Sequence, residues 1–351
     1  MKKAYLVLEN EMVFEGYRIG SDRDSVGELV FNTGVVGYIE TLTDASYYGQ
    51  IVMQTFPLVG NYGMIEEDTG SKPALFGYVA RELCEEPSNF RTQYTLNKFL
   101  KDNDIPGICG VDTRALTRII RENGVMNAKI CSEIPTDFTD IKAFKIENAV
   151  SAVGCTEKNT VSPKGEKKYS VAILDYGEKT AIVNELVSRE CEVTVYPHNT
   201  DAEEILAGGH SGVMLSNGPG DPSENVFEIQ QIAKMCGELP IFAVGLGHQL
   251  LALANGGKTV KLKYGHRGGN QPVRDLMGTR TYITSQNHGY VVESCANAKV
   301  TFANANDDTC EGLGYENIKA FSVQFEAATA NGPHDTGFLF DKFIEIMGGE
   351  N

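Results

Sequence analysis

The sequence predicts an α/β protein in two parts, an N-terminal β-rich α/β domain followed by a doubly wound domain with a mostly parallel sheet. Its 351 residues are enough for two cores. From residue 169 to the end, short apolar runs alternate with stretches of helical period, the βαβα order that produces a parallel sheet. Residues 1–150 instead hold short strand-like runs split by Gly and Asp turns. Residues 151–168, which are low in apolar side chains, are the expected linker.

The composition excludes several classes of function. A net charge of -16 disfavours nucleic acid or an anionic membrane surface as a partner. No apolar run approaches the ~20 residues of a membrane span. The first apolar run ends early at Glu9, which predicts a strand and not a signal peptide. The eight cysteines show no CxxC pair and no metal spacing, so we expect reduced thiols, no metal site and a cytoplasmic location.

The N-terminal domain is predicted to contain several strands and one well-marked helix. The strands are expected at 4–8, 12–17, 28–32 and 49–55, and the helix at 110–121. Asp112 or Thr113 caps this helix and Gly124 ends it. Arg114, Arg118 and Arg121 follow its length in an otherwise acidic chain. They fit either a subunit contact or a solvated helix face.

The second domain is predicted to follow a regular order. Strands are expected at 171–174, 192–196, 212–215, 241–244, 280–284 and 320–325, and helices at 179–188, 201–207, 224–236, 246–254 and 335–347. Ligands of such sheets sit at the C-terminal strand ends. The loops 216–222, 245–249, 286–290 and 324–328 are therefore expected to meet at one edge.

The stretch 240–255 organises this edge. It predicts a buried strand that turns sharply into a helix, the geometry of a nucleophile elbow that exposes one side chain. The elbow position is Gly245, which has no side chain to expose.

The motifs of the whole chain resemble those of one family. They are, in order, FNTGVVGY, TDASYYGQI, GNYG, GVDTRALTR, LSNGPGDP, LGHQLLALA, GHRGGNQPV, TSQNHGY and GPHDT. Together they are similar to the small subunit of carbamoyl-phosphate synthetase, which carries a class I glutamine amidotransferase domain. A single Gly-rich loop would be weak evidence, whereas nine motifs in order are strong.

The resemblance implies a division of labour between two subunits. That small subunit hydrolyses glutamine and passes ammonia through a tunnel to a large synthetase subunit, which makes carbamoyl phosphate for pyrimidine or arginine biosynthesis. ATP, magnesium and bicarbonate are expected on the large subunit, and no cofactor in this chain. The expected partners are thus the large subunit and glutamine.

The resemblance also implies a glutamine-binding shell. Its members would be Ser46, Gly218, Gly220, Leu246, Gln249, Asn287, Gly289 and Tyr290. The backbone N–H groups of Gly220 and Leu246 would form the oxyanion hole.

The catalytic triad of the family is not matched. The family places Cys where this chain has Gly245, and His and Glu where it has Glu326 and Ala328. The spacing from Gln324 to the motif at Gly332–Asp335 fits without a gap, which favours replacement. A His-Pro deletion balanced by a later insertion would instead make Glu326 the family Glu. Nucleophile and base are missing under both alignments.

No other residue is expected to substitute for them. Cys236 precedes the central strand and is expected to be a buried thiol. His248 and His288 are expected to have packing or hydrogen-bonding roles, and Glu326 acting on water is a poor match for amide cleavage.

The sequence therefore favours a small subunit that has lost glutaminase activity. A glutamine-sensing regulatory pseudoenzyme and an active glutaminase with unfamiliar residues are the alternatives. A nucleotide-binding oxidoreductase is disfavoured because no GxGxxG follows the first strand of the second domain.

Overall fold

The computed structural model describes residues 2–177, 180–328 and 333–349. Lys179 and Gly332, which fall in a predicted helix and in the GPHDT motif, lie outside the described residues. The chain divides into two compact units, Met1–Glu147 and Asn148–Asn351. The predicted α/β class is confirmed.

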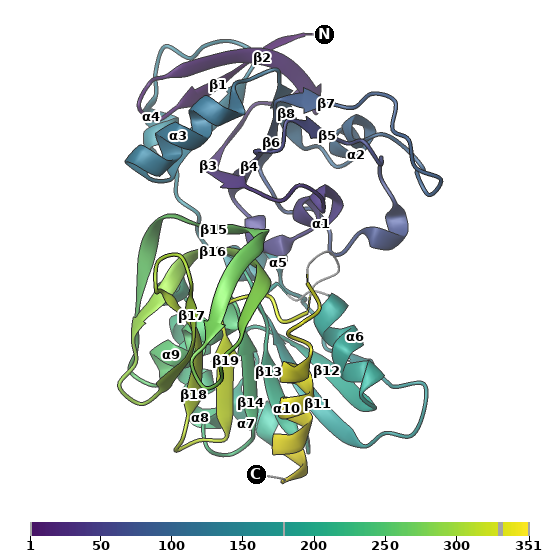
Figure 1. The fold of residues 1–351 in the computed structure, drawn as a ribbon, viewed down its shortest axis with the longest axis vertical. Coiled ribbons are helices and arrows are strands. Elements are labelled where there is room, and N and C mark those ends of the chain that lie inside the picture. Colours follow the sequence, from purple (N-terminus) through teal and green to yellow (C-terminus); the bar gives the residue numbers. More distant parts are fainter. Residues whose placement is uncertain (1, 178–179, 329–332, 350–351) are drawn as a thin grey trace. The chain divides into compact units, whose positions relative to one another are not determined.

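The first unit is built on a closed barrel (Figure 1). Around it the strands follow the order β1-β2-β8-β6-β4-β3-β9, and β9 returns to pair with β1. Closure leaves no exposed sheet edge in this barrel. Its strands are β1 (Lys3–Leu8), β2 (Val13–Gly20), β3 (Ser25–Asn32), β4 (Gln50–Gln54), β6 (Gly77–Ala80), β8 (Pro106–Cys109) and β9 (Met126–Cys131).

Short helices and one small ribbon surround the barrel. They are α1 (Tyr38–Leu42), η1 (Ala45–Tyr47), β5 (Leu58–Val59), η2 (Glu66–Asp68), β7 (Glu82–Leu83), α2 (Leu96–Asp102), α3 (Thr113–Asn123) and α4 (Thr139–Ala143). The sequence left the cap of α3 open, and the structure assigns it to Asp112, whose carboxylate accepts from the N–H groups of Arg114 and Ala115. Gly124 ends the helix as predicted.

The second unit contains a ten-stranded mixed sheet. Its strand order is β10-β12-β11-β13-β14-β19-β18-β17-β15-β16. The five strands from β12 to β19 are parallel and form its centre. The strands are β10 (Asn159–Val161), β11 (Tyr169–Asp175), β12 (Cys191–Pro197), β13 (Gly212–Leu215), β14 (Ile241–Val244), β15 (Lys258–Asp275), β16 (Thr281–Ser294), β17 (Lys299–Asn304), β18 (Cys310–Tyr315) and β19 (Ala320–Val323).

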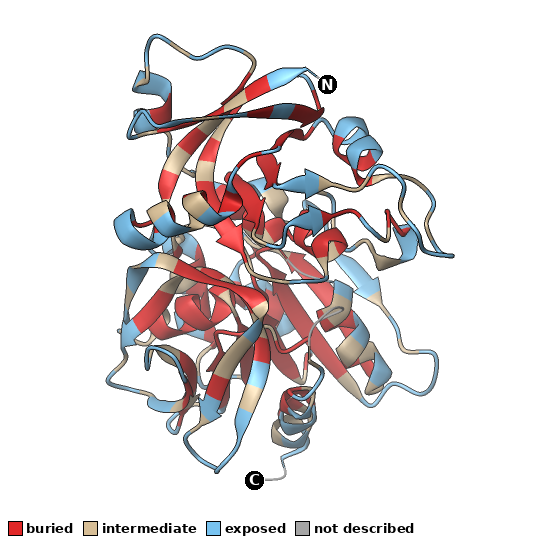
Figure 2. Ribbon diagram, turned by 45° about the horizontal axis from the view of Figure 1, so that its top comes forward, coloured by how far each residue is buried: buried red, intermediate tan, exposed pale blue. Residues whose placement is uncertain are grey.

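Helices cover both faces of the parallel centre. Alternate residues of β11 enter different cores: Ala172 packs with α7 (Ala202–Ala207), α8 (Val226–Met235) and α9 (Leu246–Ala254). Val171 packs on the other face with α6 (Thr180–Ser188) and α10 (Phe338–Gly348). Figure 2 shows the central strands buried along their length between these layers. Because each strand is buried on two faces, it appears in the sequence as a continuous apolar run.

Of the antiparallel half of the sheet only the start of β16 was predicted, as the strand at 280–284, and β15, β17 and β18 were not, so the sheet has more antiparallel pairs than expected. The hairpin of β15 and β16 shifts register between Lys261 and His266 and again between Gly268 and Gln271. Such irregularities break the alternation of apolar and polar residues by which a strand is recognised in sequence.

The segment expected as a linker, 151–168, lies within the second unit. It contains the end of α5 (Ala149–Val153) and the whole of β10, which pairs antiparallel with β12. β10 is a short strand at the edge of the sheet and contains few apolar residues. A linker has the same low apolar content, so the sequence alone does not separate the two. In the part of the chain that the structure describes, no helix is long and apolar enough to cross a membrane.

Candidate functional site

The elbow between β14 and α9 keeps the backbone geometry that the sequence predicts. Gly245 has φ 58° and ψ −115°, a conformation that residues with a side chain rarely adopt. Its N–H donates to the Val323 carbonyl at 3.0 Å, which holds the turn against β19. A Cβ built on Gly245 would lie 3.0 Å from Cβ of Asn217. The elbow is therefore tightly supported although it presents no side chain.

The loop after β13 lies directly beside the elbow. A Cβ on Gly218 would be 2.3 Å from the Tyr176 carbonyl oxygen and 3.0 Å from Leu246 Cδ2, so only glycine fits there. The Gly247 N–H donates to the Ser216 carbonyl at 3.0 Å and joins this loop to the start of α9. The structure thus brings Gly218 and Leu246 together, as the sequence predicted.

Gln249 connects the elbow helix to two further strands. Its Nε2 donates to the Tyr290 carbonyl of β16 at 2.8 Å and to Gln324 Oε1, just after β19, at 2.9 Å. The Glu326 N–H donates to the Ser285 carbonyl at 3.0 Å, so the chain after β19 pairs with β16. The four loops expected to converge do meet at this edge of the sheet.

The remaining predicted residues take different positions. Gly220, with φ 92°, packs against Ala149. Asn287 stands opposite Arg267 in the β15–β16 hairpin. Gly289 follows two residues later on β16, where an added Cβ would lie 3.2 Å from the Arg267 guanidinium. Ser46 belongs to the first unit, where its N–H donates to the Asp44 carboxylate at 2.9 Å. The part of Ser46 in glutamine binding stays a prediction.

The positions that match the family's base and its orienting acid have contrasting environments. Glu326 is partly exposed, whereas Ala327 and Ala328 are buried in the apolar core beneath α10. A carboxylate at position 328 would therefore enter apolar surroundings, while the Glu326 carboxylate reaches partial solvent.

Nearby histidines are held in structural roles. His248 is fully buried, its Nδ1 lies 2.8 Å from Ser322 Oγ, and burial lowers its pKa to about 3. It is neutral at physiological pH and a very weak base. Burial also lowers the pKa of His288, whose Nδ1 contacts the Tyr290 carbonyl.

Cys236 lies at the opposite end of β14 from the elbow. It ends α8 and accepts a hydrogen bond from Asn255 Nδ2 at 3.6 Å, and burial raises its pKa. The sequence predicted a buried thiol, but Cys236 is only half-buried because it lies at a helix end. It is among eight free cysteines. A protonated thiol at this end cannot replace a nucleophile at Gly245.

Comparisons with known proteins match both units. Residues 6–130 match the family model described as carbamoyl-phosphate synthase small chain, CPSase domain, and residues 172–346 match glutamine amidotransferase class-I. The carbamoyl phosphate synthase small chain of Clostridium perfringens is 47% identical over 349 residues, which are 98% of this chain and 99% of the relative. The chain belongs to the carbamoyl-phosphate synthase small-chain family.

Other members of the family show the same extent of similarity. The small chain of Listeria monocytogenes serotype 4b is 46% identical over 100% of this chain and 98% of the relative. That of Lactococcus lactis is 44% identical over 99% of this chain and 99% of the relative. The family resemblance predicted from the motifs is confirmed over the full length, and the elbow at Gly245 lies inside its amidotransferase domain.

One group of residues was missed in the sequence. His266, His288 and Glu311 meet in the interior of the second unit. They come from β15, β16 and β18, two of which were not predicted, so no local spacing could have revealed them.

Proposed function

We propose that this chain is a carbamoyl-phosphate synthase small subunit that binds glutamine without hydrolysing it. It then supports a large subunit that makes carbamoyl phosphate from free ammonia. The observation that carries this proposal is the elbow itself: Gly245 has the backbone geometry of the nucleophile position and no nucleophile.

Loss of hydrolysis follows from the chemistry that the position lacks. Amide cleavage by this type of site proceeds through a covalent thioester, which needs a thiolate and a base that takes its proton. Glu326 is the sole titratable side chain among the three unmatched positions, and a carboxylate beside a thiol would raise the thiol's pKa. His248 does not serve as the base because it is buried, neutral and bonded to Ser322.

Retention of glutamine binding is supported by the packing of the shell. Gly218 lies so close to the Tyr176 carbonyl that a side chain at this position would clash with it. Gln249 is held by hydrogen bonds to Tyr290 of β16 and to Gln324 just after β19. These contacts do not depend on a side chain at position 245. Glutamine would be recognised by the residues assigned from the family resemblance, including Ser46 and Asn287.

Partnership with a large subunit is supported by family membership and by α3. Arg114, Arg118 and Arg121 are exposed on this helix. ATP, magnesium and bicarbonate would bind the large subunit and none of them this chain.

The test combines three measurements on the purified chain, alone and co-expressed with a carbamoyl-phosphate synthase large subunit. Calorimetry should detect glutamine binding, ammonia release from glutamine should stay at background, and the complex should make carbamoyl phosphate from ammonium salts. Glutamine hydrolysis at the rate of an ordinary amidotransferase would overturn the proposal.

A second function is favoured by the same observation. A shell that retains glutamine and cannot consume it has the properties of a glutamine sensor. Glutamine-dependent change in the large subunit's ammonia-dependent rate would support this regulatory role. A rate independent of glutamine, together with measurable binding, would exclude it.

A further inference from the structure

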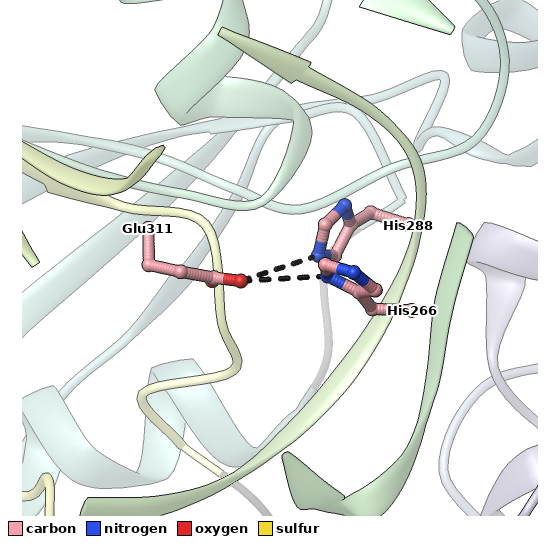
Figure 3. A group of neighbouring side chains, drawn as sticks. All are labelled: His266, His288 and Glu311. Carbon is pink, nitrogen blue, oxygen red and sulfur yellow. Dashed lines mark ion pairs between the residues drawn. The ribbon is translucent and has the colours of Figure 1, made fainter. Parts of the chain in front are cut away.

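Three side chains that the proposed function does not use converge inside the second unit. His266 of β15, His288 of β16 and Glu311 of β18 point toward one another (Figure 3). One donor atom from each lies within 4.8 Å of the other two. All three side chains are buried, and Glu311 is fully shielded from solvent.

The separations between these donors are those of ligands around a metal ion. Glu311 Oε1 lies 3.5 Å from His266 Nδ1 and 3.9 Å from His288 Nε2. Both distances exceed the ~2.7–3.2 Å of an N–H···O hydrogen bond. A tetrahedral zinc ion with bonds of ~2.0–2.2 Å spaces its ligands by roughly 3.3–3.6 Å. The group is thus wider than a hydrogen-bonded triad and close to the width of a metal site.

The outer nitrogens of both histidines are already bound to acceptors. His266 Nε2 lies 2.9 Å from the Asp307 carboxylate, and His288 Nδ1 lies 2.9 Å from the Tyr290 carbonyl oxygen. With the proton on its outer nitrogen, each ring in its neutral form would turn the lone pair of its inner nitrogen toward the centre of the group. Metal-binding histidines have this arrangement, with a carboxylate or a backbone carbonyl on the far side of the ring.

The interior of the group is rich in lone pairs. Glu311 Oε2 has no hydrogen-bond partner among the described residues. Gln286 Oε1 lies 3.1 Å from His288 Nε2 and is a further oxygen atom that could bind a metal ion. Asn304 Nδ2 donates to Glu311 Oε1 at 3.0 Å and lies 3.3 Å from His266 Nδ1. A cation held between these donors would compensate the desolvation of the buried Glu311 carboxylate.

We propose that His266, His288 and Glu311 bind a divalent transition-metal ion, for which zinc is the best match. Two imidazole nitrogens and one carboxylate oxygen form a donor set that suits zinc and not magnesium or calcium. The sequence predicted no metal from cysteine spacing, whereas this site is assembled from three strands. The ion would join β18 to the hairpin whose second strand carries Asn287, Gly289 and Tyr290.

The experiment measures metal directly on the full chain, freed of any affinity tag. The chain is stripped with a chelator, titrated with Zn²⁺ against a chromophoric competitor, and titrated with Co²⁺ while the visible spectrum is recorded. We expect each chain to bind one equivalent of metal ion with high affinity. The spectrum of bound Co²⁺ should show the bands of nitrogen and oxygen ligands and no thiolate charge-transfer band. That last criterion separates the site from the free cysteines.

Variants decide whether these residues are the ligands. Glu311→Gln and His288→Asn should abolish the high-affinity equivalent, and Asp307→Asn should weaken it by ~10–100-fold because it holds the far side of His266. The matched control is His198→Asn, which breaks another histidine–glutamate pair, His198 with Glu228 at 2.6 Å, and should leave binding unchanged.

Two results would overturn the assignment. One is a stripped chain that folds and binds neither ion above the level of the folded Glu311→Gln chain. The other is a Co²⁺ spectrum dominated by thiolate. If the ligand variants fail to fold, Asp307→Asn alone tests whether these residues bind the metal, since Asp307 is partly exposed and its replacement leaves the core intact. Because none of these measurements involves glutamine, their failure is distinguishable from failure of the proposed function.

Discussion

Gly245 lies against Asn217 so closely that an added Cβ would sit 3.0 Å from Cβ of Asn217. The elbow therefore accepts a side chain only if Asn217 moves by a few tenths of an ångström. At φ 58°, any residue other than glycine is also strained. A cysteine at position 245 would therefore be destabilised both by the contact with Asn217 and by its backbone conformation.

Gly245→Cys should lower the free energy of unfolding by ~1–3 kcal/mol and yield no glutaminase activity. The thiol has an ordinary pKa of ~8.5 and no base beside it, so it stays protonated at neutral pH. Urea denaturation and ammonia release would measure both effects. Gly245→Ala should show a similar loss of stability, and a cysteine variant as stable as the parent would mean that the elbow relaxes freely.

The triple variant Gly245→Cys, Glu326→His, Ala328→Glu should gain measurable glutaminase activity while each single variant stays inactive. Triad members act as a unit, so their effects are strongly non-additive. The variant should also be the least stable of the set, because Ala328 is 5% exposed and a carboxylate there is desolvated.

Trapping of the glutamyl thioester followed by mass spectrometry would test this repair. A triple variant that folds and binds glutamine but never forms the thioester would show that the shell has diverged beyond the triad positions.

Reversal of the α3 arginines should weaken the complex with the large subunit. Arg114, Arg118 and Arg121 changed together to Glu should reduce co-purification severalfold, since they place three cations on one exposed helix. The control reverses Lys258, Lys263 and Lys299, three exposed lysines of the second unit. If both variants recover equal amounts of the large subunit, α3 is not part of the interface.

Glu40 should make the first unit less stable as pH rises. Burial raises its pKa from an ordinary value of 4.5 to about 7, and its Oε2 has no hydrogen-bond partner among the residues described. Between these two values the folded state holds a proton that the unfolded state has released, so stability falls as pH increases through this window. The loss levels off once the pH has passed the folded-state pKa of about 7.

Glu40→Gln removes that titration and should therefore be more stabilising at pH 8 than at pH 5, relative to the parent chain. Denaturation of both proteins at the two pH values gives the difference directly. Glu82→Gln, at an exposed position, is the control and should show no such dependence.

The parallel centre of the second unit was predictable because each strand is buried on both faces. Ile241–Val244 forms β14 with the predicted bounds, and Gly245 follows it at the elbow. Of the antiparallel half only the start of β16 was predicted, since the bulged hairpin of β15 and β16 mixes polar and apolar residues without a period. For the same reason the group around Glu311 was invisible in sequence, although Gln249 and Gly218 were placed correctly at the sheet edge.

The hydrogen bond from the Gly245 N–H to the Val323 carbonyl has an evolutionary consequence. The turn is fastened through main-chain atoms, so this anchor does not require a side chain at the tip of the turn. Selection for a folded subunit that binds its partner would then not require a nucleophile at position 245. Under the proposed function, a change to glycine at this position would relieve backbone strain without disturbing that anchor. A lineage can in this way shed the reaction while keeping the assembly, and reversal requires several coordinated changes instead of one.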